Sequence, residues 1–161
     1  MIVSCRALHY IHNHIPVLTR FKEALKPSGK ILLSFLGEGS NNFLHFVLQK
    51  LLRHGKWKEL KNLNYQFYSP AEYREMLKAV EFSTNSVEIY PYPLKDNNSQ
   101  IEIKQRIEKV WFSLSTRIPP EIYDTFLEEL VSIYIERNPP NQSGLIKSKA
   151  EWLEIQATAI P

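Results

Sequence analysis

The residues whose types could carry chemistry gather near the start of the chain: Cys5, His9, His12 and His14. His12 and His14 have a His-x-His spacing that metal sites use, but no cysteine and no acid lies close beside them. We therefore assign no metal and expect a solvated turn there. Cys5 is the single cysteine and cannot form an internal disulfide. A free thiol at the end of a strand is by default a small packed hydrophobe.

Two strands and the helix between them would position these residues. The apolar run at 2–5 predicts a strand, and from Pro16 onward apolar residues recur every three or four positions, as in a helix. The Pro/Gly turn at 25–29 ends that helix. The run at 31–35 predicts a strand that is buried on both faces. Strand, helix and strand in this order predict a parallel α/β sheet, in which ligands bind at the carboxyl ends of the strands.

A later helix has clear start signals, and two strands follow it. Ser69, Pro70 and Glu72 have the spacing of a capping box with proline at the first helical position, and Tyr68 and Tyr73 are spaced for a hydrophobic staple. Alternation predicts a strand at 86–90 and a final strand whose inner face carries four apolar residues: Leu153, Ile155, Ala157 and Ala159.

The middle of the chain has a different pattern. A helical pattern covers 43–52, and two further amphipathic patterns lie between the polar break at 94–99 and the Pro-rich segment at 138–144. We therefore predict an α/β core made of 1–93 and 150–161, with a helical insertion at 94–149.

Composition restricts the class of protein. The 161 residues suit one domain, and the net charge of +3 is spread without a basic stripe, so we expect no nucleic-acid partner. No apolar run is long enough to cross a bilayer, so we expect no membrane partner. A single cysteine without a signal peptide suggests a reducing cytoplasm.

The order of the motifs resembles a known family. The sequence Leu8-His9-Tyr10 after the first strand, the turn Leu25-Lys26-Pro27-Ser28-Gly29 before the second, and the later Tyr68-Ser69-Pro70 are similar to the carboxyl half of class I S-adenosylmethionine-dependent methyltransferases. Within that superfamily, the chain looks most like the trans-aconitate methyltransferase (methyltransferase type 11) group. The resemblance implies an α/β fold that contains family strands 4, 5, 6 and 7 of a Rossmann-like sheet, with a helical cap over the substrate pocket.

The resemblance also identifies what the sequence lacks. No Gly-x-Gly pattern follows a strand and opens a helix, since Gly37-Glu38-Gly39 comes after the family's fifth strand. The chain could be a fragment of a longer enzyme, a remnant that no longer methylates, or one half of a split enzyme. As it stands, the chain would expose the strand at 2–5 as an unpaired edge, which favours self-association or a partner chain.

The family's functional positions fall on particular residues. Cys5, Arg6 and Ala7 would lie against the cofactor. The resemblance implies five residues for the substrate pocket: His9, Tyr10, Gly37, Trp57 and Trp111. Ser40 to Asn42 would border the same pocket.

Charged residues of the predicted cap could bind an acid. Arg106 and Arg117 are candidates, because a guanidinium pairs well with a carboxylate, although surface helices also carry arginines for no such reason. Glu81 stands where relatives prefer a glycine that ends a helix at positive φ.

The resemblance implies attack of a small-molecule oxygen, that of a carboxylate, on the methyl group of S-adenosylmethionine. A carboxylate is already nucleophilic and needs alignment more than a base. A phenol or alcohol would need one, and His9 is the catalytic candidate because neutral imidazole accepts a proton near pH 7. The alternative is a catalytically inactive module that acts through interactions and lacks the cofactor-binding half.

Overall fold

The computed structural model describes residues 1–39, 42–53, 55–60, 66–92, 99–110, 116, 118–147 and 150–161. The chain forms two compact units. The α/β unit comprises Met1–Ser40, Tyr65–Pro93 and Lys149–Pro161, and the helical unit comprises Asn41–Asn64 and Leu94–Ser148. The helical unit thus includes 41–64, which the sequence had suggested would belong to the α/β core.

A four-stranded sheet forms the centre of the α/β unit. Its strands are β1 (Ile2–Cys5), β2 (Lys30–Leu36), β3 (Phe82–Tyr92) and β4 (Ala150–Ala159), in the spatial order β1-β2-β4-β3. Strands β1 and β2 are parallel, as predicted, whereas β4 runs antiparallel to both of its neighbours. The mixed α/β class is confirmed, with β1 at one edge of the described sheet.

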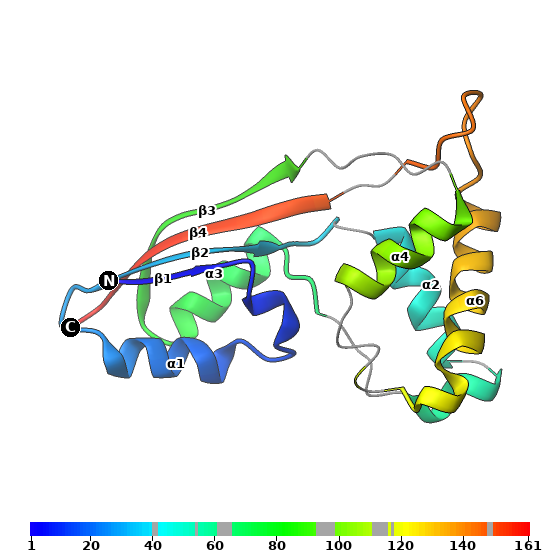
Figure 1. The fold of residues 1–161 in the computed structure, drawn as a ribbon. Helices are drawn as coiled ribbons and strands as arrows, with labels where there is room; N and C mark the ends of the chain where they lie inside the picture. The colour runs from blue at the N-terminus through cyan, green and yellow to red at the C-terminus, as the bar shows by residue number, and fades with distance from the viewer. Residues whose placement is uncertain are drawn as a thin grey trace. The chain divides into compact units, whose positions relative to one another are not determined.

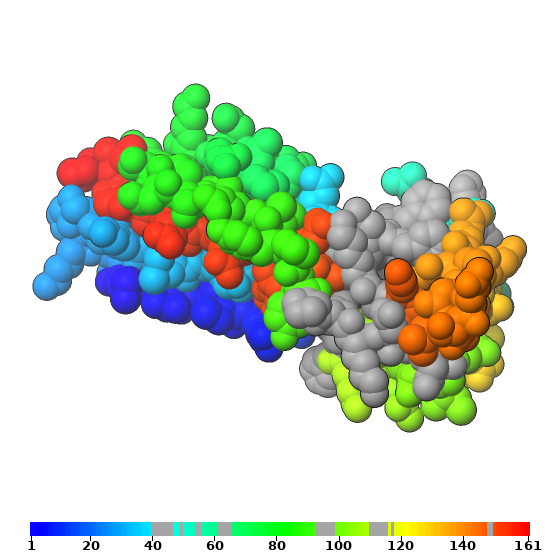
Figure 2. Space-filling view, turned by 90° about the horizontal axis from the view of Figure 1, so that it is seen from above, coloured from blue at the N-terminus to red at the C-terminus, as the bar shows by residue number. Residues whose placement is uncertain are grey.

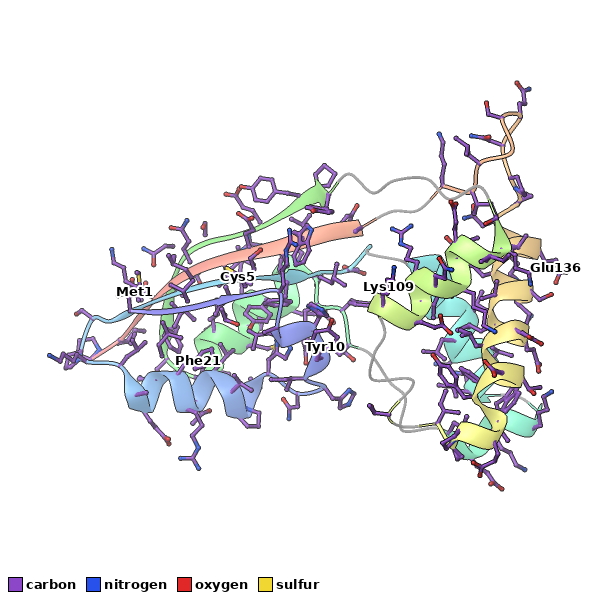
Figure 3. The ribbon with its side chains drawn as sticks, viewed as in Figure 1. Met1, Cys5, Tyr10, Phe21, Lys109 and Glu136 are labelled. Carbon is purple, nitrogen blue, oxygen red and sulfur yellow. The ribbon has the colours of Figure 1, made fainter. Side chains whose placement is uncertain are left out.

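Two helices cover one face of this sheet. They are α1 (Ile15–Ala24) and α3 (Pro70–Ala79), and Figure 1 shows both on the same side. In Figure 3, Phe21 points from α1 toward the strands. The core between helices and sheet includes the four residues predicted for the inner face of the final strand. Burial of these apolar side chains is the main stabilising contribution to the unit.

The opposite face of the sheet has no described helix of this unit on it. Figure 2 views the unit from this side, with β1 in blue, β4 in red and β3 in green at the surface. On β2, Ile31, Leu33 and Phe35 are buried, whereas Leu32 and Ser34 are only half-buried. The prediction that this strand is buried on both faces is therefore wrong. Its continuous apolar run hides the alternation that the structure shows.

The start of α3 confirms the local prediction. The Ser69 hydroxyl accepts from the backbone N–H of Glu72 at 3.2 Å, and the Glu72 carboxylate accepts from the backbone N–H of Ser69 at 2.8 Å. Pro70 occupies the first helical position. The rings of Tyr68 and Tyr73 lie 5.8 Å apart, so the staple also forms. Together these contacts satisfy backbone donors that the first turn leaves without helical partners.

The end of α3 explains the departure at Glu81. The residue adopts φ +59°, the left-handed conformation that a glycine would adopt more easily. Its carboxylate accepts from Lys22 Nζ at 2.6 Å, which ties the turn after α3 to α1 and lowers the pKa of Glu81. The ion pair offsets part of the conformational cost.

The helical unit contains α2 (Asn42–Arg53), the short 3₁₀ segment η2 (Gly55–Leu60), α4 (Gln100–Val110) and α6 (Pro120–Arg137). Helix α6 contacts both α2 and α4. The buried side chains of this unit include Val47, Leu51, Ile103, Ile107, Phe126, Leu127, Leu130 and Tyr134. Within the described ranges, no helix has the length and hydropathy needed to span a membrane.

Candidate functional site

The chain leaves the sheet sharply at the carboxyl end of β1. Arg6 has φ +58°, and its backbone N–H donates to the Ser34 carbonyl of β2 at 2.7 Å. This extra bond holds the turn against the neighbouring parallel strand. Cys5 and Ala7, on either side of Arg6, are both exposed, so the expectation of a packed thiol is wrong.

The Arg6 side chain lies beside two aromatic rings that are distant from it in sequence. Its guanidinium carbon lies 5.5 Å from the ring centre of Tyr92 and 5.2 Å from that of Trp152. The guanidinium also donates a hydrogen bond to the Tyr92 hydroxyl at 3.3 Å. Because β3 runs parallel to β2, Tyr92 lies at the same edge of the sheet as Arg6, and Trp152 lies near the start of antiparallel β4.

His9 lies beside this group, in the 3₁₀ turn η1 (Leu8–Tyr10) that follows Arg6. Its ring centre is 4.2 Å from that of Tyr10 and 6.4 Å from that of Trp152. Figure 3 shows Tyr10 on this turn. Burial, with a smaller contribution from His14, lowers the pKa of His9 to about 4, so its imidazole is neutral at pH 7. His9 Nδ1 and Trp152 Nε1 are buried and have no hydrogen-bond partner in the described part of the chain.

His14 corrects the prediction of a solvated turn. Its side chain is fully buried, whereas His12 is exposed. His14 Nε2 lies 2.8 Å from the Leu8 carbonyl oxygen, which can only accept, so Nε2 carries the proton. Nδ1 then accepts from the Tyr73 hydroxyl, 3.3 Å away. Burial lowers the pKa of His14, and this neutral ring joins η1 to α3.

The loop after β2 has structural reasons for its glycines. A side chain at Gly37 would place a Cβ 2.9 Å from the Leu153 Cβ, and its backbone N–H donates to the Glu151 carbonyl at 2.9 Å. Gly39 has φ +96°, and a Cβ there would coincide with the Glu151 carboxylate. Gly37 is therefore needed for close packing, and its role in a pocket stays a prediction.

Trp57 belongs to the helical unit. Its indole N–H donates to Glu129 at 2.8 Å, its ring meets Phe126 edge-on, and Lys56 lies over its face. It is almost fully buried. These contacts account for Trp57 as part of the packing between η2 and α6, and its predicted pocket role stays a prediction.

Other predicted pocket residues divide between described and undescribed positions. Arg106 lies half-buried on α4 and interacts with another residue of the chain. Trp111, Arg117, Ser40 and Asn41 lie outside the described residues. Among the residues that the structure describes, no group of three or more His, Cys, Asp or Glu side chains is placed to hold a metal.

Sequence reasoning overlooked Tyr92 and Trp152. Alternation along the final strand places Trp152 and Leu153 on opposite faces of the sheet. This pattern could have shown that Trp152 lies outside the core between the sheet and the helices. Nothing local could have paired either residue with Arg6, because 86 positions separate Arg6 from Tyr92.

The open sheet with helices packed on one face has the Rossmann-like fold found in S-adenosylmethionine-dependent methyltransferases. No family model matches the chain, and no curated protein matches it significantly in sequence. The fold assignment therefore comes from solved structures.

A protein from Bacillus halodurans that is assigned as a methyltransferase superposes with a TM-score of 0.58 at 14% identity, over 99% of this chain and 70% of its own. The YcgJ protein of Bacillus subtilis gives a TM-score of 0.51 at 19% identity, over 99% and 64%. Loganic acid methyltransferase, solved with S-adenosylhomocysteine (SAH), gives 0.50 at 16% identity, over 83% and 43%. This chain thus spans less than two thirds of the length of several structures that it resembles.

Proposed function

We propose that this chain provides the acceptor side of methyl transfer from S-adenosylmethionine to a small-molecule oxygen, with a carboxylate as the acceptor. The observation that supports this is the gathering of Arg6, His9 and Trp152 at the carboxyl ends of β1 and β2 in a methyltransferase fold. Ligands of open α/β sheets bind at this edge. Loganic acid methyltransferase, one of the similar structures, is named for an acid.

The described residues fit only part of the cofactor that the fold implies. Cys5 and Ala7 are exposed beside the strand end and could contact it, as the resemblance implies for positions 5–7. Gly37 and Gly39 offer no cradle, because Leu153 and the Glu151 carboxylate fill the space that their missing side chains leave. We therefore assign Cys5 and Ala7 to one end of the cofactor and expect weak binding.

The chemistry needs little from the protein beyond placement. S-adenosylmethionine, when bound, supplies an electrophilic methyl group. A carboxylate oxygen is already nucleophilic, so residues that orient it are sufficient. If the acceptor were a phenol or alcohol, the neutral His9 could take up its proton, which keeps His9 as the catalytic candidate.

The remaining expectations extend this proposal. The proposal includes membership of the trans-aconitate group, a cytoplasmic location and association through β1. It also includes a substrate cap at 94–149, with Trp57 and Trp111 in the pocket. The position of β1 at an edge of the described sheet supports association through this strand.

The second candidate function, a non-methylating interaction module, is favoured by the lack of a Gly-rich turn between a strand and a helix.

Two measurements on the 161-residue chain separate these functions. The first is titration with SAH, followed by the backbone amide signals of positions 5–7 in nuclear magnetic resonance spectra. The second is incubation with labelled S-adenosylmethionine and a panel of carboxylic acids, followed by detection of base-labile methyl esters. We expect weak, saturable shifts at positions 5–7 and ester formation. No shift and no ester would overturn the proposal and favour the interaction module.

A further inference from the structure

We propose that Arg6, His9 and Trp152 form the binding site for the carboxylate group of a small organic acid. The inference rests on the proposed function for the identity of this acid as the methyl acceptor, and it gives Arg6 a role toward the acceptor instead of the cofactor. The binding site itself is argued from the contacts of these three side chains.

The side chains of Arg6 and His9 both lie beside the ring of Trp152. The Arg6 guanidinium lies 5.2 Å from the ring centre of Trp152, and the His9 ring centre lies 6.4 Å from it, at an edge-on angle of 78°. The three residues come from the carboxyl end of β1, from η1 and from the start of β4. The sheet order brings them to a single edge.

Two of these groups have a polar atom for which the described residues supply no partner. His9 Nδ1 and Trp152 Nε1 are both buried without a hydrogen bond. Leaving a buried polar group unpaired is costly, so two such atoms on rings whose centres lie 6.4 Å apart point to a ligand that satisfies both. The indole N–H can only donate, so the ligand must present an acceptor.

The charge at the site specifies an anion. Arg6 donates to the Tyr92 hydroxyl, and among the described residues no carboxylate forms an ion pair with it. Its other N–H groups remain for a planar, bidentate partner, which a carboxylate matches. The rings of Tyr92 and Trp152 fix the orientation of the guanidinium.

His9 suits the same ligand. Its imidazole is neutral at pH 7, so it carries one proton, and the tautomer with that proton on Nδ1 donates to an anion. Tyr10 and Tyr92 are 43% and 38% exposed and leave aromatic surface beside the polar groups. A carboxylic acid with a flat apolar body satisfies both the donors and this surface.

The test compares benzoate with benzamide, which has nearly the same shape without the charge. The chain has three tryptophans, and a Trp152→Phe variant identifies the indole N–H signal of Trp152 in ¹H–¹⁵N spectra. We expect benzoate to shift that signal saturably, while benzamide does so at least tenfold more weakly. No shift with benzoate, or equal shifts with both probes, would overturn the site.

Two arginine variants sharpen the test. Arg6→Gln should weaken benzoate binding at least tenfold. Arg20→Gln is the matched control, because Arg20 lies exposed on α1 in a surface pair with Glu23. It should leave binding unchanged. Equal affinities for the two variants would contradict the site, provided that the spectra show both to be folded.

The outcome is separable from that of the proposed function. Benzoate binding at Trp152 without any methyl ester formation would leave the carboxylate site standing and remove the methyl-transfer role. Ester formation with an acceptor KM that Arg6→Gln and Trp152→Phe leave unchanged would support the methyl-transfer role and overturn the carboxylate site.

Discussion

Two buried histidines from the same short segment have opposite surroundings. Both ring nitrogens of His14 are paired, with the Leu8 carbonyl and the Tyr73 hydroxyl, and its ring packs edge-on against Phe35. His9, five positions earlier, is nearly as buried but leaves Nδ1 without a partner. A fully satisfied buried network stabilises a fold, whereas a partly satisfied one marks a place that is built for something else. The comparison gives His14 a structural role and supports the binding role proposed for His9.

The largest expected effect is at the satisfied histidine. His14→Leu would leave the Tyr73 hydroxyl buried without a described partner and would leave the Leu8 carbonyl with only the Ile11 backbone N–H, so it should lower the free energy of unfolding by about 3 kcal/mol. Urea unfolding at pH 7 measures this loss. His12→Gln, at an exposed position, is the control and should change stability by less than about 0.5 kcal/mol. Similar losses in both variants would contradict the structural role of His14.

The pH dependence of stability tests both histidines together. Their pKa values are lowered on folding, to about 4 for His9, so the unfolded chain binds more protons between that value and 6.5. Stability should therefore be full above pH 6.5 and fall as the pH drops. The loss contributed by His9 should reach about 2 kcal/mol by pH 5, at about 1.4 kcal/mol per tenfold change in proton affinity.

Urea midpoints at pH 7 and pH 5 measure this loss, and His9→Leu should remove part of it. If wild type and His9→Leu lose stability equally over this range, the His9 ring is not desolvated as described.

The hydrogen bond between Tyr73 and His14 should have an intermediate effect. Tyr73→Phe keeps the ring in the core but removes the hydroxyl that donates to His14 Nδ1. We expect a loss of about 1.5 kcal/mol in urea unfolding at pH 7, because Nδ1 then resembles the unpaired atom of His9. In the His14→Leu background the same change should cost much less, and equal costs in both backgrounds would exclude coupling between the two side chains.

The smallest effect is expected at the unsatisfied histidine. His9→Leu replaces a buried unpaired nitrogen by an apolar group of similar size, so stability at pH 7 should stay constant or rise by about 1 kcal/mol. The same variant should bind benzoate more weakly. A loss above about 1 kcal/mol would show that His9 supports the fold much as His14 does, and would remove the contrast between them.

Local signals predicted the elements that depend on neighbours in sequence. Ser69 and Glu72 meet three positions apart, so their spacing alone predicted the cap of α3. The inner face of β4 followed from alternation. The positive φ of Glu81 came from no local signal, because only the resemblance marked this position as one where relatives prefer glycine. The strand at 2–5 and its parallel partner also followed from the order of elements.

Long-range partners decided what the sequence could not. His12 and His14 look alike in sequence, and only Tyr73, 59 positions away, distinguishes the buried ring from the exposed one. Arg6 was assigned by resemblance to the cofactor, but its ring partners, Tyr92 and Trp152, lie more than 80 positions away. The grouping of 41–64 with the helical unit likewise depends on contacts between α2 and α6.

The central position of β4 has a consequence for biosynthesis. Because β4 lies between β2 and β3, β3 has no neighbour in the described sheet until residues 150–159 are available. On the ribosome, the nascent chain can form helices and the β1–β2 pair early, but the sheet cannot close until that segment has left the exit tunnel. Pairing across such long sequence separations is slow, so β3 would be exposed to other chains during synthesis, and its need for chaperones should last until β4 is available.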